Sequence, residues 1–183
     1  MAHIQKATFA AGCFWGVEHI FKKNFDVITR VGYIGGKTDK PSYKQVCSGN
    51  TGHAEAVQIE YDSTKISYET LVEFFYKTHD PTTANSQGPD VGSQYRSAIF
   101  YYDDDQKNVA KDVTQRLQEK LNAAKEKADK EAKKIINPLK YSGFKIVTEI
   151  VEAGRFFDAE SYHQQYLDKN PGGYECPTHF VRW

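Results

Sequence analysis

The stretch GCFWG at residues 12–16 decides how the first part of the chain folds, because it separates two segments of different periodicity. Residues 4–9, directly before it, are typical of a strand, whereas the apolar residues directly after it recur at helical spacing. The change predicts a strand, a sharp turn, and a helix from Trp15 to about Lys23. Cys13 is therefore expected at the N-terminus of that helix.

The position of Cys13 bears on its reactivity. Unpaired N–H groups and the positive end of the helix dipole stabilise a thiolate at a helix N-terminus. The glycines on either side allow a tight turn and allow another molecule to approach the sulfur. A free cysteine is most often a small buried hydrophobic residue, so position alone leaves both interpretations open. Trp15 lies close to the thiol and next to a glycine, which is more typical of a pocket wall than of a core residue and so favours a reactive Cys13.

The composition indicates one domain and argues against two classes of partner. A chain of 183 residues can bury its own core, so we expect a single, monomeric domain over residues 1–183. Its 24 basic and 24 acidic residues give a net charge of zero, which argues against a nucleic-acid-binding surface. No apolar run reaches membrane-spanning length, and the N-terminal residues lack the apolar segment of a signal peptide. We therefore expect a cytoplasmic protein.

The three cysteines, Cys13, Cys47 and Cys176, are scattered and odd in number. Neither a disulfide scaffold nor a structural zinc site fits this pattern, so we expect no metal. In a reducing compartment such thiols are either inert or chemically active. Aromatic residues make up 14% of the chain, which is compatible with a site lined by aromatic side chains.

The order of the predicted elements indicates the fold. After the first helix they are a strand at 27–33, a loop at 35–52, a strand at 53–61, a helix after Ser67, a loop at 81–94, a strand at 95–102, a long helix after residue 105, a strand at 144–151, a short helix at 158–167 and an irregular tail at 170–183. The charged stretch 120–134 is expected to be a solvated helix face. The first six elements follow the ferredoxin-like βαββαβ order. We therefore predict an α/β protein, in detail an α+β two-layer sandwich with additional helices and an irregular C-terminal tail.

Glu55 stands out in the strand at 53–61, because it alternates in phase with the large apolar residues Val57, Ile59 and Tyr61. A carboxylate that points into a core is costly unless it is paired, hydrogen-bonded or protonated. The alternative is a solvated glutamate at the start of the strand. If Glu55 does point inward, apolar surroundings raise its pKa and make it an acid near neutral pH.

A thiol, an acid and an aromatic pocket together suggest a reaction. The thiol would attack an electrophile, and the acid would protonate the group that leaves. An aromatic pocket suits a small apolar group such as a methyl. Gly172 and Gly173 would let Cys176 swing towards Cys13, which is useful if the first thiol ends as a sulfenic acid.

The sequence resembles the methionine sulfoxide reductase A family along nearly its whole length. The matching segments are GCFWG at 12–16, GY at 32–33, GG at 35–36, PSY at 41–43, GHAEAV at 52–57, HDPTT at 79–83, GSQYRSAI at 92–99 and HQQYL at 163–167. In this order they make the match highly specific. The resemblance implies an enzyme that reduces the S epimer of methionine sulfoxide, free or within oxidised proteins, to methionine.

The resemblance also implies a role for each matching residue. Cys13 would be the nucleophile, and Glu55 the acid that protonates the sulfoxide oxygen. The implied substrate contacts are Phe14 and Trp15 for the methyl group, Tyr43 and Tyr95 for the oxygen, and Asp90 for the lining of the site. Cys13 would be left as a sulfenic acid, and a C-terminal thiol would close a disulfide that thioredoxin, or dithiothreitol, reduces. No metal or organic cofactor is implied.

The second thiol is less certain from the sequence. Cys176 is the expected resolving cysteine, although the tail has one residue more between Tyr174 and Cys176 than many relatives have. Cys47 is expected to be inert, with a resolving role as the alternative.

Two other functions are compatible with a reactive Cys13. One is a cysteine hydrolase or acyltransferase with His53 or His163 as base, although both histidines are expected to bond neighbouring backbone. The other is a binding module in which Cys13 and Cys176 switch the docking of the tail without turnover. Only the reductase predicts that methionine forms from methionine sulfoxide and a thiol.

Overall fold

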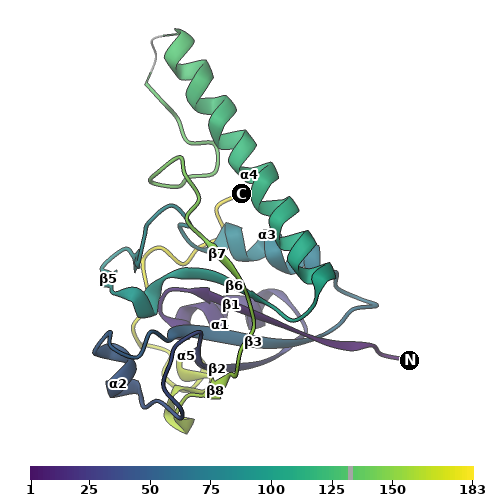
Figure 1. Cartoon of the computed structure of the whole chain (residues 1–183), viewed down its shortest axis with the longest axis vertical. Coiled ribbons are helices and arrows are strands. Elements are labelled where there is room, and N and C mark those ends of the chain that lie inside the picture. Colours follow the sequence, from purple (N-terminus) through teal and green to yellow (C-terminus); the bar gives the residue numbers. More distant parts are fainter. Residues whose placement is uncertain (132–133) are drawn as a thin grey trace.

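A computed structural model describes residues 1–131 and 134–183 (Figure 1). Six strands form one sheet in the order β7-β6-β1-β3-β2-β8. The strands are β1 Ile4–Ala11, β2 Ile28–Ile34, β3 Ala54–Asp62, β6 Ser97–Tyr101, β7 Glu149–Glu152 and β8 Phe157–Asp158, with a separate hairpin of β4 Ser86–Gln87 and β5 Asp90–Val91. The helices are α1 Phe14–Asn24, α2 Tyr43–Cys47, α3 Tyr68–Thr78, α4 Asp104–Glu131 and α5 Tyr166–Lys169, with the 3-10 turns η1 Ser93–Tyr95 and η2 Ser161–His163.

The four central strands confirm the ferredoxin-like core. In the order β6-β1-β3-β2 every neighbouring pair is antiparallel. Helix α1 connects β1 to β2, and α3 lies between β3 and β6, which completes the βαββαβ order. Strand β7 extends one edge in parallel with β6, and β8 extends the other edge against β2.

Both faces of the sheet are covered, by different means. On one face alternate strand residues such as Phe9, Val57 and Ile59 pack against α1, α3 and α4 in the main core. The other face buries small residues and Phe100, against which Phe156 packs. Because β7 and β8 lie at opposite edges, the segment between them crosses this second face, as Figure 1 shows.

Two predicted elements are only partly correct, because tertiary contacts take up some of their backbone groups. Within the predicted strand at 144–151, only the end that belongs to β7 pairs in the sheet. Before it, the Gln118 side chain bonds the Phe144 carbonyl and the Ile146 N–H. The Val147 N–H donates to a loop carbonyl. The predicted helix at 158–167 begins instead as β8. Gln164 then bonds the backbone of β2, and Gln165 adopts a left-handed conformation with φ of 53°.

The two long loops contain more structure than expected. The loop at 35–52 includes α2, which begins with a capping box in which Ser42 and Gln45 satisfy each other's backbone N–H groups. The loop at 81–94 includes the β4–β5 hairpin, and Tyr95 ends the turn η1 rather than beginning a strand.

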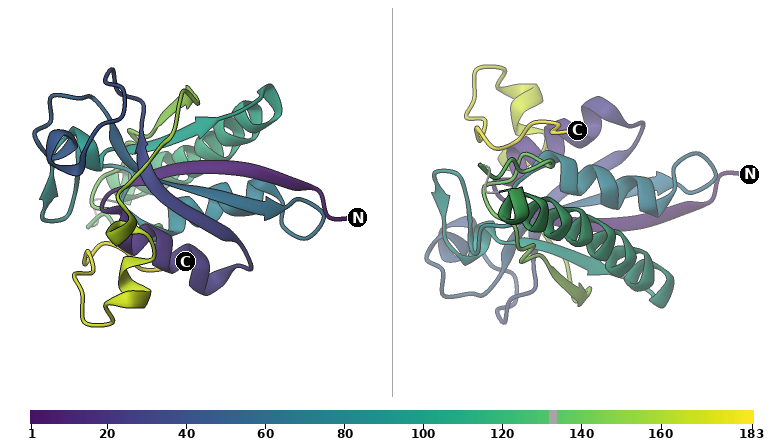
Figure 2. Two further views of the ribbon diagram at one scale, coloured as in Figure 1. Left: turned by 90° about the horizontal axis from the view of Figure 1, so that it is seen from below. Right: turned by 90° about the horizontal axis from the view of Figure 1, so that it is seen from above.

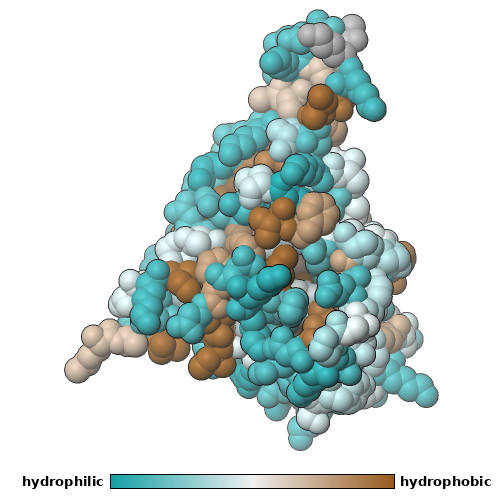
Figure 3. All heavy atoms as spheres, turned by 180° about the vertical axis from the view of Figure 1, so that it is seen from behind, coloured by the Kyte–Doolittle hydropathy of each residue, from teal (hydrophilic) through white to brown (hydrophobic). Residues whose placement is uncertain are grey.

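The long helix α4 packs on the body through its first half, and its second half extends away from the sheet (Figure 1). Its charged side chains from Lys120 to Glu131 are exposed, which confirms the solvated face as far as the described residues go. Residues 132 and 133 of the charged stretch lie outside them. Seen from behind, hydrophobic residues are scattered among hydrophilic ones (Figure 3). Within residues 1–131 and 134–183, no helix combines the length and hydrophobicity that membrane crossing requires.

Ser67 confirms a local prediction and provides a test of it. Its side chain accepts a hydrogen bond of 3.1 Å from the Thr70 N–H at the start of α3. We expect Ser67→Ala to lower the free energy of unfolding by about 1 kcal/mol, because an N–H of the first turn loses its partner. Urea unfolding measures the change. Ser67→Asp keeps an acceptor and should retain the stability; an equal loss in both variants would contradict the capping role.

Candidate active site

Cys13 lies where the sequence predicts it, in the tight turn between β1 and α1. It is the N-cap residue of α1, and its side chain is 8% exposed. Gly12 before it has a φ of +95°, which only glycine adopts without strain. The turn therefore presents the thiol at the start of a helix, near the surface but largely covered.

Glu55 points inward from β3 and meets the turn that carries Cys13. Its side chain is 1% exposed, and Oε2 accepts a 3.2 Å hydrogen bond from the Phe14 N–H, the first amide of α1. The solvated alternative for this glutamate is therefore wrong. Strand β3 lies beside β1 in the sheet, and this pairing brings residues 41 positions apart to one place.

Burial sets the protonation of both groups. Burial raises the pKa of Glu55 to about 8, the Phe14 N–H opposes this shift, and the charge of Asp90 adds to it. Burial also raises the pKa of the Cys13 thiol well above its usual range, and the neighbouring Glu55 raises it further. The Trp15 N–H lowers the pKa of the thiol but does not compensate. A thiolate stabilised by the helix N-terminus is therefore not the resting state, because desolvation outweighs the helix.

Tyr43 and Tyr95 reach the same place from two different loops. Tyr43 is the first residue of α2, and Tyr95 is the last residue of η1. Burial raises the pKa of each hydroxyl, and the charge of Glu55 contributes in both cases. Both hydroxyls therefore remain protonated at neutral pH and can donate hydrogen bonds beside Glu55.

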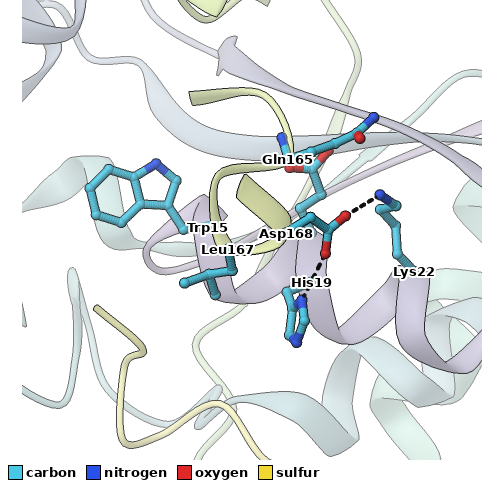
Figure 4. Close-up of a pocket in the computed structure, with 7 residues that line it drawn as sticks. Trp15, His19, Lys22, Gln165, Leu167 and Asp168 are labelled. Carbon is cyan, nitrogen blue, oxygen red and sulfur yellow. Dashed lines mark hydrogen bonds and ion pairs between the residues drawn. The ribbon is translucent and has the colours of Figure 1, made fainter. Parts of the chain in front are cut away.

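Phe14 and Trp15 are held by partners from the C-terminal third of the chain. The Phe14 ring is buried, with its centroid 5.1 Å from that of His163. The Trp15 ring stacks on Tyr166 at 3.7 Å, and its indole N–H donates a 2.9 Å hydrogen bond to His163 Nδ1. Figure 4 shows Trp15 apart from a cluster in which His19 and Lys22 of α1 bond Asp168 of α5. Phe14 thus contributes to the core, whereas Trp15 is only half-buried.

Asp90 belongs to the small hairpin, in β5, and is bound by the tail. Both of its carboxylate oxygens accept hydrogen bonds from the Tyr174 hydroxyl, at 3.2 and 3.1 Å. Its charge contributes to the raised pKa values of Cys13 and Glu55. Asp90 is therefore electrostatically part of the site, although the tail occupies its oxygens.

His163 and Glu160 support the site, and the sequence reasoning missed both roles. The His163 ring is buried between Phe14 and Tyr43, and it bonds an indole instead of the expected backbone. Glu160 Oε1 accepts hydrogen bonds from the Tyr33 hydroxyl and the Tyr43 N–H, each at 3.3 Å. The available signal for His163 was the HQQYL match at 163–167, whereas Glu160 lies outside every matching segment. No periodicity links this part of the chain to β1 or α2.

His53 behaves as expected. Its Nδ1 accepts a hydrogen bond from the Gly36 N–H, and its Nε2 bonds the Thr38 carbonyl. Both ring nitrogens therefore have backbone partners.

The glycines that flank Cys13 make room for the protein itself. A Cβ on Gly12 would lie 2.8 Å from Cβ of Gln87 in the hairpin, and a Cβ on Gly16 would overlap Nδ1 of His179 in the tail. The hairpin and the tail therefore fill the space beside both glycines, and the approach of another molecule to the sulfur stays a prediction. In Figure 2 the yellow tail runs beside the purple α1.

All three cysteines are free. Cys176 is 3% exposed, its thiol donates to the Gln87 carbonyl at 3.5 Å, and it is near enough to contribute to the raised pKa of Cys13. Cys47 is exposed at the end of α2 and interacts with the Tyr43 hydroxyl. Both candidates for the second thiol therefore lie near the site. Cys176 contacts Gln87 of the hairpin, and Cys47 contacts Tyr43 of α2.

Comparisons with known proteins agree on one family. The model of the family "Peptide methionine sulfoxide reductase" matches residues 5–128 and 121–181. The probable peptide methionine sulfoxide reductase of Schizosaccharomyces pombe is 46% identical, over 98% of each chain. The crystal structure of reduced Mxr1 from Saccharomyces cerevisiae has a TM-score of 0.80 and 41% identity, over 98% of this chain and 93% of that one. Mxr1 in complex with Trx2 has a TM-score of 0.56 and 26% identity, over 98% and 91%.

Proposed function

The chain belongs to the peptide methionine sulfoxide reductase family and reduces methionine sulfoxide to methionine at the expense of thiols, and we propose that Cys13 and Glu55 carry out this reaction. The observation that carries the proposal is the 3.2 Å hydrogen bond from the Phe14 N–H to Glu55 Oε2. It holds a carboxyl group of raised pKa against the residue that follows the thiol.

In the proposed first step, the sulfur of Cys13 attacks the sulfoxide sulfur while Glu55 donates its proton to the sulfoxide oxygen. An S–S bond begins to form as the S–O bond weakens, and the thiol proton restores Glu55. Transfer of the hydroxyl group to Cys13 releases methionine and leaves Cys13 as a sulfenic acid. One thiol and one sulfoxide thus give one sulfenic acid and one thioether, which balances atoms and electrons.

The tyrosines and aromatic rings would orient the substrate. Tyr43 and Tyr95 remain protonated, so both can donate hydrogen bonds to an oxygen that gains negative charge beside Glu55. We assign the substrate methyl group to the surface formed by Phe14 and the half-buried Trp15. Holding the oxygen on one side and the methyl on the other would distinguish the two sulfoxide epimers, and the family resemblance implies that the S epimer is the substrate.

We further propose that Cys176 resolves the sulfenic acid to a disulfide with loss of water. Thioredoxin is a partner of the family, as the complex of Mxr1 with Trx2 illustrates, and dithiothreitol can replace it as reductant.

Among the described residues no cluster of three metal-ligating side chains is present, and the proposed steps need no prosthetic group. Free, scattered thiols fit a reducing compartment, which supports a cytoplasmic location.

The hydrolase alternative has little support. His163 accepts the Trp15 indole N–H at Nδ1, and its Nε2 lies 3.6 Å from Glu160 Oε2. Both nitrogens of His53 bond backbone groups, so no hydrogen bond links either ring to Cys13. A binding module without turnover would not require an acid of raised pKa beside the thiol.

The second thiol can be identified directly. We expect enzyme that is oxidised by one equivalent of methionine sulfoxide, without reductant, to contain a Cys13–Cys176 disulfide, found by peptide mapping under non-reducing conditions. We expect Cys176→Ser to produce one methionine per enzyme but to lose most thioredoxin-dependent turnover, with Cys47→Ser as the matched control. A Cys13–Cys47 disulfide in the wild-type enzyme would assign resolution to Cys47 instead.

A further inference from the structure

The turn that contains Cys176 is docked as a unit on the β4–β5 hairpin. The His179 N–H donates to the Cys176 carbonyl at 3.0 Å and closes the turn. Thr178 lies 3.2 Å from the Cys176 sulfur and donates to Gln87 Oε1, also at 3.2 Å. The Cys176 thiol itself donates to the Gln87 carbonyl. Gln87 therefore contacts the second thiol on one side and, through its Cβ, Gly12 on the other.

The His179 ring attaches this turn to the turn that carries Cys13. Its Nε2 lies 2.8 Å from the Ala11 carbonyl, and because a carbonyl only accepts, Nε2 carries the proton and donates. The ring, which is partly buried, packs in the notch left by Gly12 and Gly16, and any side chain on Gly16 would displace it. Nδ1 is buried without a hydrogen-bond partner, so the hydrogen bond to Ala11 is the polar anchor of the ring.

Among the described residues, the other hydrogen bonds of this turn reach the hairpin and α3 and do not reach β1. Before it, Gly172 has no neighbour within 4 Å of its Cβ position, and Tyr174 bonds the hairpin at Asp90. After it, Arg182 bonds the Lys77 carbonyl at the end of α3. His179 is thus the residue of the turn that bonds β1 directly ahead of the nucleophile.

We propose that His179 is a positioning residue for the resolving step: seated in the Gly12–Gly16 notch, it holds the Cys176 turn against the turn that carries Cys13. The proposal rests on the proposed function, in which Cys176 attacks the sulfenic sulfur of Cys13. In that step a sulfur–sulfur bond forms, the S–O bond of Cys13 breaks, and the hydroxyl leaves as water with the Cys176 proton. His179 is assigned no role at the reacting atoms and acts by keeping Cys176 within reach.

The test separates the two half-reactions in a Cys47→Ser parent. His179→Leu fills the notch without a donor, whereas His179→Gln keeps an N–H that can reach the Ala11 carbonyl. With methionine sulfoxide and no reductant, we expect methionine to form in both variants at a rate within about threefold of the parent. Disulfide formation should be at least tenfold slower in His179→Leu, with more Cys13 trapped by dimedone as sulfenic acid, and His179→Gln should recover most of the rate.

Each other result has a defined meaning. An unchanged rate of disulfide formation in His179→Leu, or an equal loss of both half-reactions in His179→Leu and His179→Gln, would overturn the positioning role. If His179→Leu does not fold, Gly16→Ala supplies the test, because its methyl group displaces the ring of an intact His179; normal resolution there would also overturn the role. Rapid disulfide formation in Cys176→Ser with Cys47 intact would instead contradict the proposed role of Cys176 as the resolving thiol, whatever His179 does.

Discussion

Replacing Cys13 with serine should abolish turnover, lowering kcat by more than about a thousandfold. A serine hydroxyl is a poor nucleophile towards sulfur and cannot take up the oxygen as a sulfenic acid. The fold should persist, because serine is nearly isosteric with cysteine and the turn depends on Gly12, whose φ is +95°. Methionine released from methionine sulfoxide with excess dithiothreitol measures the loss, and near-ultraviolet circular dichroism checks the fold.

The chain contains a matched control for this variant. Cys47→Ser makes the same chemical change on an exposed thiol at the end of α2 and should change kcat by no more than about twofold. Dimedone should label Cys13 in a Cys176→Ser enzyme after one turnover and should label nothing in the double variant that also lacks Cys13. Residual activity of Cys13→Ser above a few per cent would remove Cys13 from the role of nucleophile.

Replacing Glu55 with glutamine should lower kcat on the order of a hundredfold to ten-thousandfold, because the amide cannot donate a proton to the leaving oxygen. Glutamine has the same shape and can still accept the Phe14 N–H, so the fold and substrate binding should be retained. Wild-type kcat should fall as pH rises through about 8, where Glu55 loses its proton, and this limb should be absent from the variant.

Glu18 provides the control for burial of a carboxyl group. It is also buried and also has a raised pKa, but its oxygens accept hydrogen bonds from the Thr29 hydroxyl and the Gln165 N–H instead of the Phe14 N–H. Glu18→Gln should keep kcat within a few fold of wild type. Equal activity losses in the two variants, or a wild-type profile that is flat between pH 7 and 9, would remove the acid role from Glu55.

The raised pKa of Glu55 also affects the stability of the fold in a predictable direction. Glu55 has a pKa near 4.5 when unfolded and about 8 when folded, so the folded protein binds the extra proton between these values. Because the folded state holds more protons, the free energy of unfolding should fall as pH rises from about 4.5 to about 8 and then level off. The Glu55→Gln variant should lack this contribution, which urea unfolding at a series of pH values can measure.

Local signals were reliable where the interactions are local. The change of periodicity at residues 12–16 placed Cys13 at the start of α1, and alternation in β3 placed Glu55 inward. The order of elements was enough for the ferredoxin-like core, because each strand and helix has its own apolar pattern. The predicted strand at 144–151 and helix at 158–167 failed where Gln118 and Gln164 bond backbone groups far away in the sequence.

The sequence by itself determined the family and the core topology and predicted Cys13 as the thiol and Glu55 as the acid, because these depend on short motifs and on periodicity along single elements. Only the tertiary structure decided the protonation of Cys13, the support of Trp15 and Tyr43 by His163 and Glu160, and the packing of His179 against Gly16. The physical reason is that desolvation and side-chain partnership depend on which segments pack together, and the segments that surround Cys13 come from opposite ends of the chain.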